Sequence, residues 1–271
     1  MKITWDSEAE KMLRRVPFFV RKGVRTKVEE VVAAAGRNLV TRKDLEESKR
    51  KQLKSLSEGI KGFSLEACFG SSGCHHAVVS SADMVSNLDS LLEKADLLTF
   101  LRSRLGERLK LHHQLRITIA DCPNSCSQPQ IKDIGIIGQA QIDCNPDECT
   151  GCGECEAACE ESAIVLKDGF LVGMDEKLCV ECGACARICP TDSLSTAGST
   201  FSVLVGGKLG RHPQLARELT RDLDGDQVLA LVSVIVDFYK SKANSGERLG
   251  ALINRIGWEE FENSVLVAKG D

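Results

Sequence analysis

The chain has 271 residues, 13 cysteines and a formal net charge of −4, and 42% of its residues are hydrophobic. That length can bury a sizeable core and suits one large domain or two to three small ones. Charged residues make up 27% of the chain, and no apolar run reaches the roughly 18 residues of a membrane span, so we expect no membrane-spanning segment.

The cysteine count points to metal chemistry. The N-terminus, Met-Lys-Ile-Thr-Trp-Asp, has no apolar stretch followed by a small-residue cleavage site, so we expect no secretory signal and a cytoplasmic location. Thiols in that compartment are kept reduced, and the number of cysteines is odd. The sequence therefore predicts metal or cluster ligation rather than a disulfide framework.

Charge is unevenly distributed along the chain. Residues 1–62 contain 16 Lys and Arg against 9 Asp and Glu, whereas residues 143–190 contain 3 basic and 11 acidic residues. The basic segment is interpreted first as solvated helix faces and second as a surface for an acidic protein partner. Nucleic acid ranks third, because aromatic residues that could stack on bases do not alternate with the basic ones, and we expect no nucleic-acid partner.

Residues 1–62 are predicted to fold as helices. Asp6 and Ser7 precede Glu10 in a capping-box pattern, and Pro17 ends this short first helix. A second helix is predicted over about residues 18–35. Its apolar residues recur at helical spacing: Val20, Val24, Val28, Val31 and Val32.

Gly36 ends the second helix, and Thr41 caps a third with Asp44 three residues on. The stretch ITWDSEAEKMLRRVPFFVRKGVRTKVEEVVAAAGRNLVTRKDLEESKRK resembles the small helical domain at the C-terminus of the catalytic B-type subunit of light-independent protochlorophyllide reductase. The residues that fit the pattern are Trp5, Pro17, Arg21, Glu30, Gly36 and Thr41. The resemblance implies a compact docking module and nothing about catalysis.

Residues 63 to about 141 contain the first set of cysteines. Cys68 and Cys74 form C-x5-C, and Cys122 and Cys126 form C-x3-C. Four thiolates complete the ligand shell of a [4Fe–4S] cluster. A zinc site is the alternative, although zinc favours C-x2–4-C pairs, which are shorter than the first of these.

The segments around these cysteines alternate between strand and helix. Residues 116–120 are predicted as a strand that runs into the Cys122 loop, and residues 133–138 as a second strand. A helical stretch is predicted over about residues 83–105, between the two cysteine pairs. Its apolar residues are Leu88, Leu91, Leu92 and Leu98.

The stretches ACFGSSGC and LRITIADCPNSCSQPQIKDIGIIG are similar to the cluster-binding half of the siroheme-dependent sulfite and nitrite reductases. The cluster ligands implied by this resemblance are Cys68, Cys74, Cys122 and Cys126. It further implies that Cys126 bridges to the siroheme iron and that Pro123, Asn124 and Gln128 surround the cofactor. Asp121 stands where the family usually has a small residue, most often glycine.

Residues 143–195 contain a duplicated motif. C-x2-C-x2-C-x3-C occurs twice, with every cysteine of the second copy offset by 30 from the first. This is the pattern of bacterial two-cluster ferredoxins, in which the fourth cysteine of each run ligates the other cluster. The predicted ligands are Cys149, Cys152, Cys155 and Cys189 for one [4Fe–4S] cluster, and Cys179, Cys182, Cys185 and Cys159 for the other. Zinc is disfavoured here because all eight cysteines are used symmetrically.

One further cysteine and two pairs of histidines give weaker signals. Cys144 is left over and is interpreted as a structural or incidental thiol. Adjacent histidines cannot face one metal from a regular element, so no metal site is predicted at His75–His76 or at His112–His113. Because His75 and His76 follow Cys74, a hydrogen bond from them could tune the potential of the cluster.

The last segment, residues 196–271, contains TFSVLVGGKLGRHPQLA, which is predicted as a strand, a Gly-rich turn and a helix start. It does not match the P-loop pattern. It resembles the GG-(K/R)-x-G-R-x-P stretch that follows the ferredoxin insert of sulfite reductases, which implies that Lys208 and Arg211 bind siroheme carboxylates. A surface turn with solvated charges is the alternative. Helices are predicted over residues 224–239 and around Leu249, Leu252 and Ile256.

The fold expected from these features is α+β. A sulfite-reductase-like α/β half-domain, residues 63–142 and 196–271, is interrupted by a two-cluster ferredoxin domain, residues 143–195, and follows a helical module, residues 1–62. Three [4Fe–4S] clusters are expected, with siroheme if the cofactor pocket is complete. Electrons are expected to enter through the acidic ferredoxin segment.

Two functions remain open, and no catalytic residue is predicted. The first is an electron-transfer subunit that docks on a catalytic redox partner through its basic N-terminal helices. The second is a siroheme-dependent sulfite or nitrite reductase, completed by a second copy or another subunit. The lack of a substrate-binding half before Cys68 favours the first, whereas the CPNSCSQ and GGKLGR stretches favour the second. Both predict an oligomer or a complex subunit.

Overall fold

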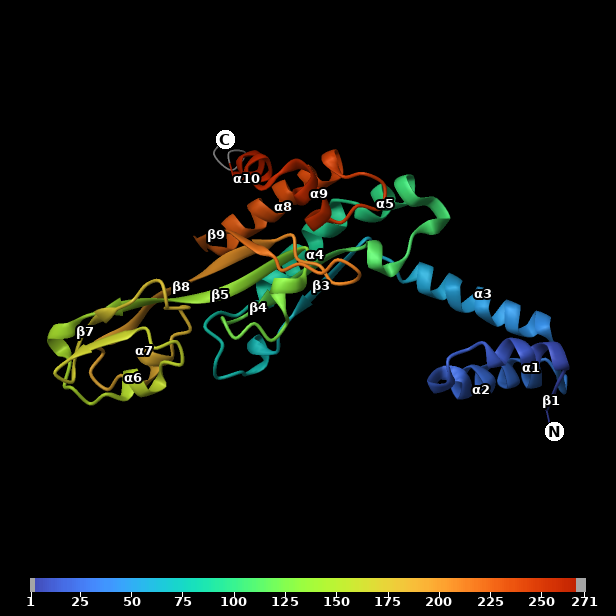
Figure 1. Ribbon diagram of the computed structural model, residues 1–271, viewed down its shortest axis with the longest axis horizontal. Helices are drawn as coiled ribbons and strands as arrows, with labels where there is room; N and C mark the ends of the chain where they lie inside the picture. The colour runs from blue at the N-terminus through green and yellow to red at the C-terminus, as the bar shows by residue number, and fades with distance from the viewer. Residues whose placement is uncertain (1–2, 267–271) are drawn as a thin grey trace. The chain divides into compact units, whose positions relative to one another are not determined.

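The computed structural model describes residues 3–266, without the side chains of residues 52–58, and contains both helices and strands (Figure 1). The mixed α+β class is therefore confirmed. The chain divides into two compact units, Met1–Ile60 and Lys61–Asp271. Each unit has its own core and is described separately.

The first unit is a three-helix module. Its helices are α1 (Ser7–Arg14), α2 (Phe18–Ala34) and α3 (Arg42–Glu58). Two short strands, β1 (Thr4–Trp5) and β2 (Leu39–Val40), pair in parallel. The buried apolar side chains of this unit are Ala9, Leu13, Val28, Val32, Val40 and Leu45. Trp5 packs against them and donates a hydrogen bond from Nε1 to Glu29 at 2.7 Å.

The start of α1 differs from the predicted capping box. Asp6 is the cap, and its carboxylate accepts a hydrogen bond from the backbone N–H of Ala9 at 2.6 Å. The position that a box reserves for Glu or Gln is thus occupied by alanine. Glu10 lies one residue too far along and faces Arg14 instead, at 3.9 Å. The helix also ends at Arg14, before Pro17.

Only part of the predicted apolar face of α2 is buried. Val28 and Val32 are 1% and 0% exposed, but Val20 and Val31 are 43% and 49% exposed. The five valines therefore cover more than one face of the helix, and the core uses one of these faces. Gly36 follows the helix with a φ of 70°, the left-handed conformation that favours glycine after a helix end.

Asp44 organises the turn before α3. The backbone N–H and the hydroxyl of Thr41 both donate to the Asp44 carboxylate at 2.8 Å, and Arg37 donates to it at 2.6 Å. The hydrogen bond from Arg37 is the main cause that lowers the pKa of Asp44 to about 2, and the bonds from Thr41 add to it against the effect of burial. Thr41 thus precedes α3 as predicted, but its hydroxyl donates to the Asp44 carboxylate, which is the hydrogen-bonding group of this turn.

We predict that the first unit loses stability as the pH falls from about 4 to about 2. Asp44 has a pKa near 3.9 in an unfolded chain but stays ionised in the folded unit down to about 2. The ionised carboxylate therefore stabilises the folded unit above about pH 4, and this stabilisation is lost as the carboxylate protonates. Since Arg37 is half exposed, the contribution is about 1 kcal/mol.

Asp44→Asn should lower the amide protection of α3 about fivefold at neutral pH, measured by hydrogen exchange, and should remove the acid step. Glu47→Gln is the matched control, because Glu47 lies on the same helix in an exposed pair with Arg50. Equal effects of the two substitutions would contradict the role of Asp44.

A five-stranded mixed sheet forms the centre of the second unit (Figure 1). The strands are β3 (Phe63–Ala67), β4 (Leu115–Ala120), β5 (Ile134–Cys144), β8 (Leu194–Val205) and β9 (Arg217–Leu223). Their order is β3-β4-β5-β8-β9, with the first three parallel and the last two antiparallel to their neighbours. The strands predicted at 116–120 and 133–138 are confirmed, and β5 continues past the predicted end to Cys144.

Helices pack against this sheet to form the main core. They include α4 (Ala82–Lys94), α8 (Gly225–Lys242), α9 (Leu249–Ile256) and α10 (Trp258–Leu266). α4 contacts β3 and α8, and α8 contacts β8. Fully buried side chains in this core include Leu88, Leu92, Ile117, Ile119, Ile134, Ile136, Leu231, Ile235 and Phe261. No helix within residues 3–266 is long and apolar enough to cross a membrane.

The helical stretch predicted over about residues 83–105 is confirmed as two helices, because the chain breaks at Asp96. This residue has a left-handed φ of 47°, and its carboxylate caps a new helix, α5 (Leu97–Leu105), by accepting from the N–H of Thr99 at 3.2 Å. The helix predicted over 224–239 corresponds to α8, and the one around Leu249 corresponds to α9.

The helix start predicted after the Gly-rich turn is wrong. Residues 206–216 form a loop closed by reciprocal backbone hydrogen bonds between Lys208 and Gln214, both at 3.0 Å, and the chain continues into β9. The Gln214 amide donates to the carbonyls of Gly206 at 2.6 Å and Gly250 at 3.2 Å. These tertiary hydrogen bonds hold an extended path where the local sequence favours a helix.

β5 and β8 extend beyond the core and carry the ferredoxin-like segment between them. Their register runs from Ile134 opposite Val205 to Cys144 opposite Leu194. The connection contains α6 (Glu154–Ala158), α7 (Ala184–Ile188), and a separate antiparallel pair, β6 (Ile164–Lys167) and β7 (Phe170–Met174). Because residues 61–271 form one compact unit, a ferredoxin domain bounded at 143 and 195 stays a prediction.

A buried ion pair ties together the strands that lead to the cysteines. Asp133 is 0% exposed, and its carboxylate accepts hydrogen bonds from Arg248 at 2.6 and 3.0 Å and from the N–H of Arg116 at 2.8 Å. Its carbonyl accepts from the N–H of Gly206 at 2.8 Å. Burial raises the pKa of Asp133, while Arg248 and the Arg116 N–H oppose that effect.

Removing one partner of this pair should be strongly destabilising, because the other charge stays buried without compensation. We predict that Arg248→Met lowers the free energy of unfolding by about 3–5 kcal/mol, measured by urea denaturation. Arg221→Met is the control, since Arg221 forms an exposed pair with Glu218 and should cost less than about 1 kcal/mol. A loss at Arg248 no larger than the control would contradict the prediction.

Candidate iron–sulfur centres

The first set of predicted ligands, the Cys68 site (Cys68, Cys74, Cys122 and Cys126), lies at the carboxyl ends of β3 and β4. These strands are parallel neighbours, so the loops that follow them meet at one edge of the sheet. The backbone N–H of Cys68 donates to the carbonyl of Ile119 at 2.9 Å. The Cys68 sulfur accepts hydrogen bonds from the backbone N–H groups of Gly70 at 3.3 Å and Asp121 at 3.2 Å.

The other three thiols of the Cys68 site lie close enough to Cys122 to act on it. Burial is the main cause that raises the pKa of Cys122, and the neighbouring thiols of Cys68, Cys126 and Cys74 raise it further. Cys126 is exposed, and the Asn124 amide donates to its sulfur at 3.2 Å. The structure therefore brings the two cysteine pairs together.

Asp121 is buried beside this site. Its side chain is 0% exposed, and neither carboxyl oxygen has a hydrogen-bond partner. The carboxyl group packs directly on Gly70, where any Cβ would collide with it. Gly70 therefore complements the larger side chain that stands at position 121.

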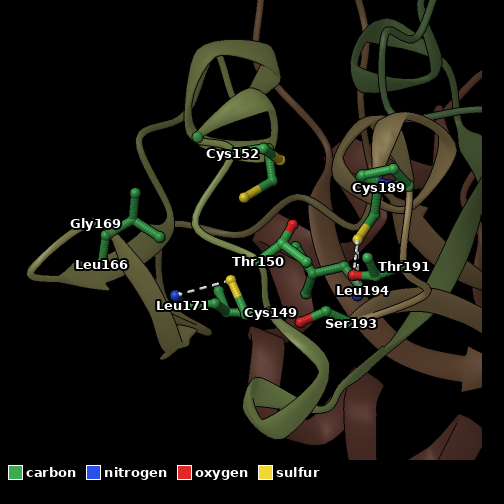
Figure 2. Close-up of a pocket in the computed structure, with 13 residues that line it drawn as sticks. Cys149, Thr150, Cys152, Leu166, Gly169, Leu171, Cys189, Thr191, Ser193 and Leu194 are labelled. Carbon is green, nitrogen blue, oxygen red and sulfur yellow. Dashed lines mark hydrogen bonds between the residues drawn. The ribbon is translucent and has the colours of Figure 1, made fainter.

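The Cys149 site (Cys149, Cys152, Cys155 and Cys189) is formed by both copies of the duplicated motif. These four residues line one pocket with Leu166, Leu171 and Leu194. Figure 2 shows Cys149 and Cys189 on opposite walls, the first accepting a hydrogen bond from the N–H of Leu171 at 3.3 Å and the second from that of Leu194 at 3.4 Å. Burial alone would raise the pKa of Cys189, but hydrogen bonds from Leu194 and Thr191 outweigh it and lower the pKa.

The Cys179 site (Cys159, Cys179, Cys182 and Cys185) also mixes the two copies. Burial is the main cause that raises the pKa of Cys185, to about 11, and the thiols of Cys179, Cys182 and Cys159 contribute. Burial is also the main cause that raises the pKa of Cys179, and the thiols of Cys182 and Cys159 add to it. Thus Cys159 and Cys189 have each crossed to the other copy, which is the arrangement that the ferredoxin pattern predicts.

Backbone N–H groups surround the sulfurs of both ferredoxin-like sites. Gly151 donates to Cys149 at 3.4 Å, Ala163 to Cys159 at 3.3 Å, and Glu181 to Cys179 at 3.4 Å. Gly151 has a φ of 73°, which turns its N–H toward the sulfur without steric cost. Such hydrogen bonds are typical of protein loops that hold thiolate-ligated clusters.

The thiol spacing differs from that of a single-ion site. Within residues 3–266, no group of three or more His, Cys, Asp or Glu side chains converges closely enough to hold one metal ion. A four-iron cluster separates its thiolates more widely than one zinc ion does, since zinc binds all its sulfurs at about 2.3 Å.

A cavity of about 1010 Å³ lies between the Cys68 site and the Cys179 site. Its walls include Cys122, Asn124 and all four cysteines of the Cys179 site. The floor is the face of β5, β8 and β9 that carries Gln139, Ser202 and Glu218. Gln139 is 5% exposed, and its side-chain oxygen has no partner.

Several predicted cofactor residues do not line this cavity. Lys208 and Arg211 lie in the 206–216 loop, which packs on the segment of Gln130 and Lys132, and neither forms part of the cavity wall. Gln128 is exposed outside it, with a φ of 59°, and Cys126 is not among its lining residues either. Of the cofactor residues predicted by resemblance, only Pro123 and Asn124 line it.

The sequence did not indicate the charged residues of the cavity. Arg187 lies on α7 and donates to the carbonyl of Cys182 at 3.1 Å, while Arg221 makes two hydrogen bonds to Glu218, both at 2.9 Å. The only local signal is that Gln139 and Ser202 are polar residues beside the apolar parts of β5 and β8. His75 and His76 also line the cavity, and their rings lie 4.0 Å apart. Cys144 is exposed and lies in none of the three sites.

Two protein families match different parts of the chain. Residues 5–49 match the family described as "Proto-chlorophyllide reductase 57 kD subunit", which covers most of the first unit. Residues 60–270 match the family described as "Nitrite and sulphite reductase 4Fe-4S domain", which covers nearly all of the second. Both resemblances proposed from the sequence are thereby confirmed.

Several curated relatives bear the names of sulfite reductases or of their subunits. The chain is 28% identical to the coenzyme F420-dependent sulfite reductase of Methanocaldococcus jannaschii, over 65% of this chain and 28% of that protein. It is 29% identical to the beta subunit of the dissimilatory-type sulfite reductase of Archaeoglobus fulgidus, over 56% and 46%. One subunit of the anaerobic sulfite reductase of Salmonella typhimurium is 26% identical, over 76% and 59%.

The fold is similar to that of a solved sulfite reductase. The crystal structure of dissimilatory sulfite reductase I aligns with a TM-score of 0.51 and 19% identity, over 74% of this chain and 51% of that one. The chain spans less than two thirds of the length of each of these relatives. From the match over residues 60–270, the chain belongs to the nitrite and sulphite reductase 4Fe-4S domain family.

Proposed function

We propose that the chain is an electron-transfer subunit of a larger oxidoreductase complex and that it carries three [4Fe–4S] clusters. The observation that carries this proposal is the grouping of twelve of the thirteen cysteines into three sets of four. Two of the relatives, from the dissimilatory-type and the anaerobic sulfite reductases, bear the names of complex subunits. The partner is expected to be a catalytic subunit or another redox protein.

The donor sets suit such clusters. Each set supplies four thiols, the number that a [4Fe–4S] cluster takes from protein. Backbone N–H groups hydrogen-bond to Cys68, Cys149, Cys159, Cys179 and Cys189. Bound clusters would supply one-electron transfer, and the pocket walls would hold water away from the sulfurs, which tunes the potential.

The positions of the three sites support one order of electron transfer among them. Cys122 of the Cys68 site and all the thiols of the Cys179 site line the same cavity, whereas the pocket of the Cys149 site contains residues of neither. The Cys179 site is therefore the intermediate one. The Cys149 site is the terminal one, where exchange with an external donor is expected.

The first prediction concerns the independence of the Cys68 site. Cys122→Ser should remove about four of about twelve irons and leave the signals of the other two clusters intact, because its thiol belongs to the Cys68 site alone. The readouts are iron content and the electron paramagnetic resonance spectrum of the reduced protein. Cys144→Ser is the matched control and should lose no iron. Equal loss from all three sites would contradict the separate assignment.

A second prediction tests the crossed arrangement. Cys189→Ser changes the second copy of the motif but should alter the cluster of the Cys149 site, because Cys189 lines that pocket. Conversely, Cys159→Ser should alter the cluster of the Cys179 site, whose thiols it influences. In the spectra of the reduced variants, each substitution should therefore change the signal of the cluster that is held mainly by the other copy of the motif. If each substitution affected its own copy, the assignment would be wrong.

A siroheme-dependent sulfite or nitrite reductase is the second candidate, favoured by the cavity beside Cys122 and Asn124. Siroheme carries many carboxylates and needs an excess of cations. The charged residues of the cavity include Lys177, Arg187 and Arg221 but also Glu160, Glu161 and Glu218. Because these charges do not favour an anion, and Lys208 and Arg211 lie elsewhere, the residues of this chain alone do not fit the cofactor. The candidate requires cations from a second copy or another subunit.

The visible spectrum of anaerobically purified protein separates the two candidates. We expect only the broad brown shoulder of iron–sulfur clusters, with about twelve irons per chain. Soret-type and red bands of siroheme in the isolated chain would instead support the reductase. Their appearance only after addition of a catalytic subunit would mean that the partner completes the cofactor site.

A further inference from the structure

The small sheet of β6 and β7 carries apolar side chains on both faces. Leu166 and Leu171 line the pocket of the Cys149 site. On the outer face lie Val165, Phe170 and Val172, here called the β6–β7 patch, which are 44%, 52% and 49% exposed. Within residues 3–266 these strands pair only with each other. The patch is thus an apolar surface with no partner in the described part of the chain.

Phe170 connects the patch to the Cys149 site. Its ring lies against Gly151, where an added Cβ would be 3.2 Å from the ring. The N–H of Gly151 donates to the Cys149 sulfur at 3.4 Å, and the N–H of Leu171 donates to the same sulfur at 3.3 Å. A protein that contacts Phe170 is therefore separated from the Cys149 thiol by a single layer of residues.

Acidic groups lie around the patch. Asp168 is in the turn between β6 and β7 and is exposed. Asp147 and Glu148 are exposed in a short 3-10 helix, Pro146–Glu148, that contacts β7. Lys167 is the single basic residue on the two strands. An apolar centre with a charged rim is the usual anatomy of a protein interface, and an acidic rim attracts a basic partner.

We propose that the β6–β7 patch is the docking surface for a basic electron-transfer protein, one that presents an apolar centre ringed by lysine or arginine. The inference rests on the proposed function, because the surface has this role only if the Cys149 site holds a cluster. The patch is small, which suits the weak and transient complexes through which redox proteins exchange electrons. Steering between opposite charges compensates for the small area by raising the rate of encounter.

The test uses the full-length, cluster-loaded chain under anaerobic conditions, with mitochondrial cytochrome c as the probe because it is a small basic haem protein. Binding is measured by isothermal titration calorimetry at low ionic strength. Phe170→Ser should weaken binding about tenfold, since it removes the central apolar anchor. Leu215→Ser is the matched control, because Leu215 is 69% exposed in the loop before β9 and should leave the affinity unchanged.

A second variant is needed because the Phe170 ring lies against Gly151, so Phe170→Ser could disturb the Cys149 site itself. Asp147→Asn combined with Glu148→Gln leaves the apolar packing intact and should weaken both the affinity and its dependence on salt. Affinity that is the same in all variants, or that does not fall between about 0.01 and 0.15 M salt, would overturn the proposal. Salt-sensitive self-association abolished by Phe170→Ser would also overturn it, because a second copy of the chain would then occupy the patch.

Iron content and reduced-state spectra of the same samples separate this inference from the proposed function. Absent clusters in the unmodified chain would contradict the proposed function. Intact clusters in every variant, together with unchanged binding of cytochrome c, would overturn only the docking surface.

Discussion

The pairing of β5 with β8 is the constraint on which the second unit depends. At one end, Ile134 and Val205 are buried in the main core, and at the other Cys144 and Leu194 lead into the ferredoxin-like segment. The same ladder thus connects the core beneath the Cys68 site to the loops of the other two sites. A shift of register by one residue would exchange buried and exposed faces along its whole length. Asp133 and Arg248 hold the buried end in place.

Electrostatics divides the two units of the chain. The first unit is strongly basic, while the ferredoxin-like segment is acidic. Within the second unit, burial raises the pKa of the Cys122 and Cys185 thiols, which favours their neutral form. If these thiols ligate clusters as proposed, cluster binding would release their protons and would therefore depend on pH.

The sequence predicts features set by neighbouring residues better than features set by contacts between distant segments. The cysteine motifs indicate which thiols share a site, because the spacing of such ligands is set by loop geometry. In contrast, the predicted helix start before residue 217 is replaced by a loop and the strand β9. Gln214 holds this extended path by hydrogen bonds to Gly206 and to Gly250, and Gly250 is far away in the sequence. The polar cavity floor at Gln139 and Ser202 likewise exists only because β5 and β8 pair. The break at Asp96 is local, but its left-handed backbone has no reliable sequence signal.

The exchange of Cys159 and Cys189 between the two motif copies has a consequence for any attempt to alter one copy alone. Each copy depends on the other for a thiol, so deletion of either copy would leave one set with three of its four thiols and the other set with one. The two copies therefore form one inseparable unit, although each carries a complete sequence motif.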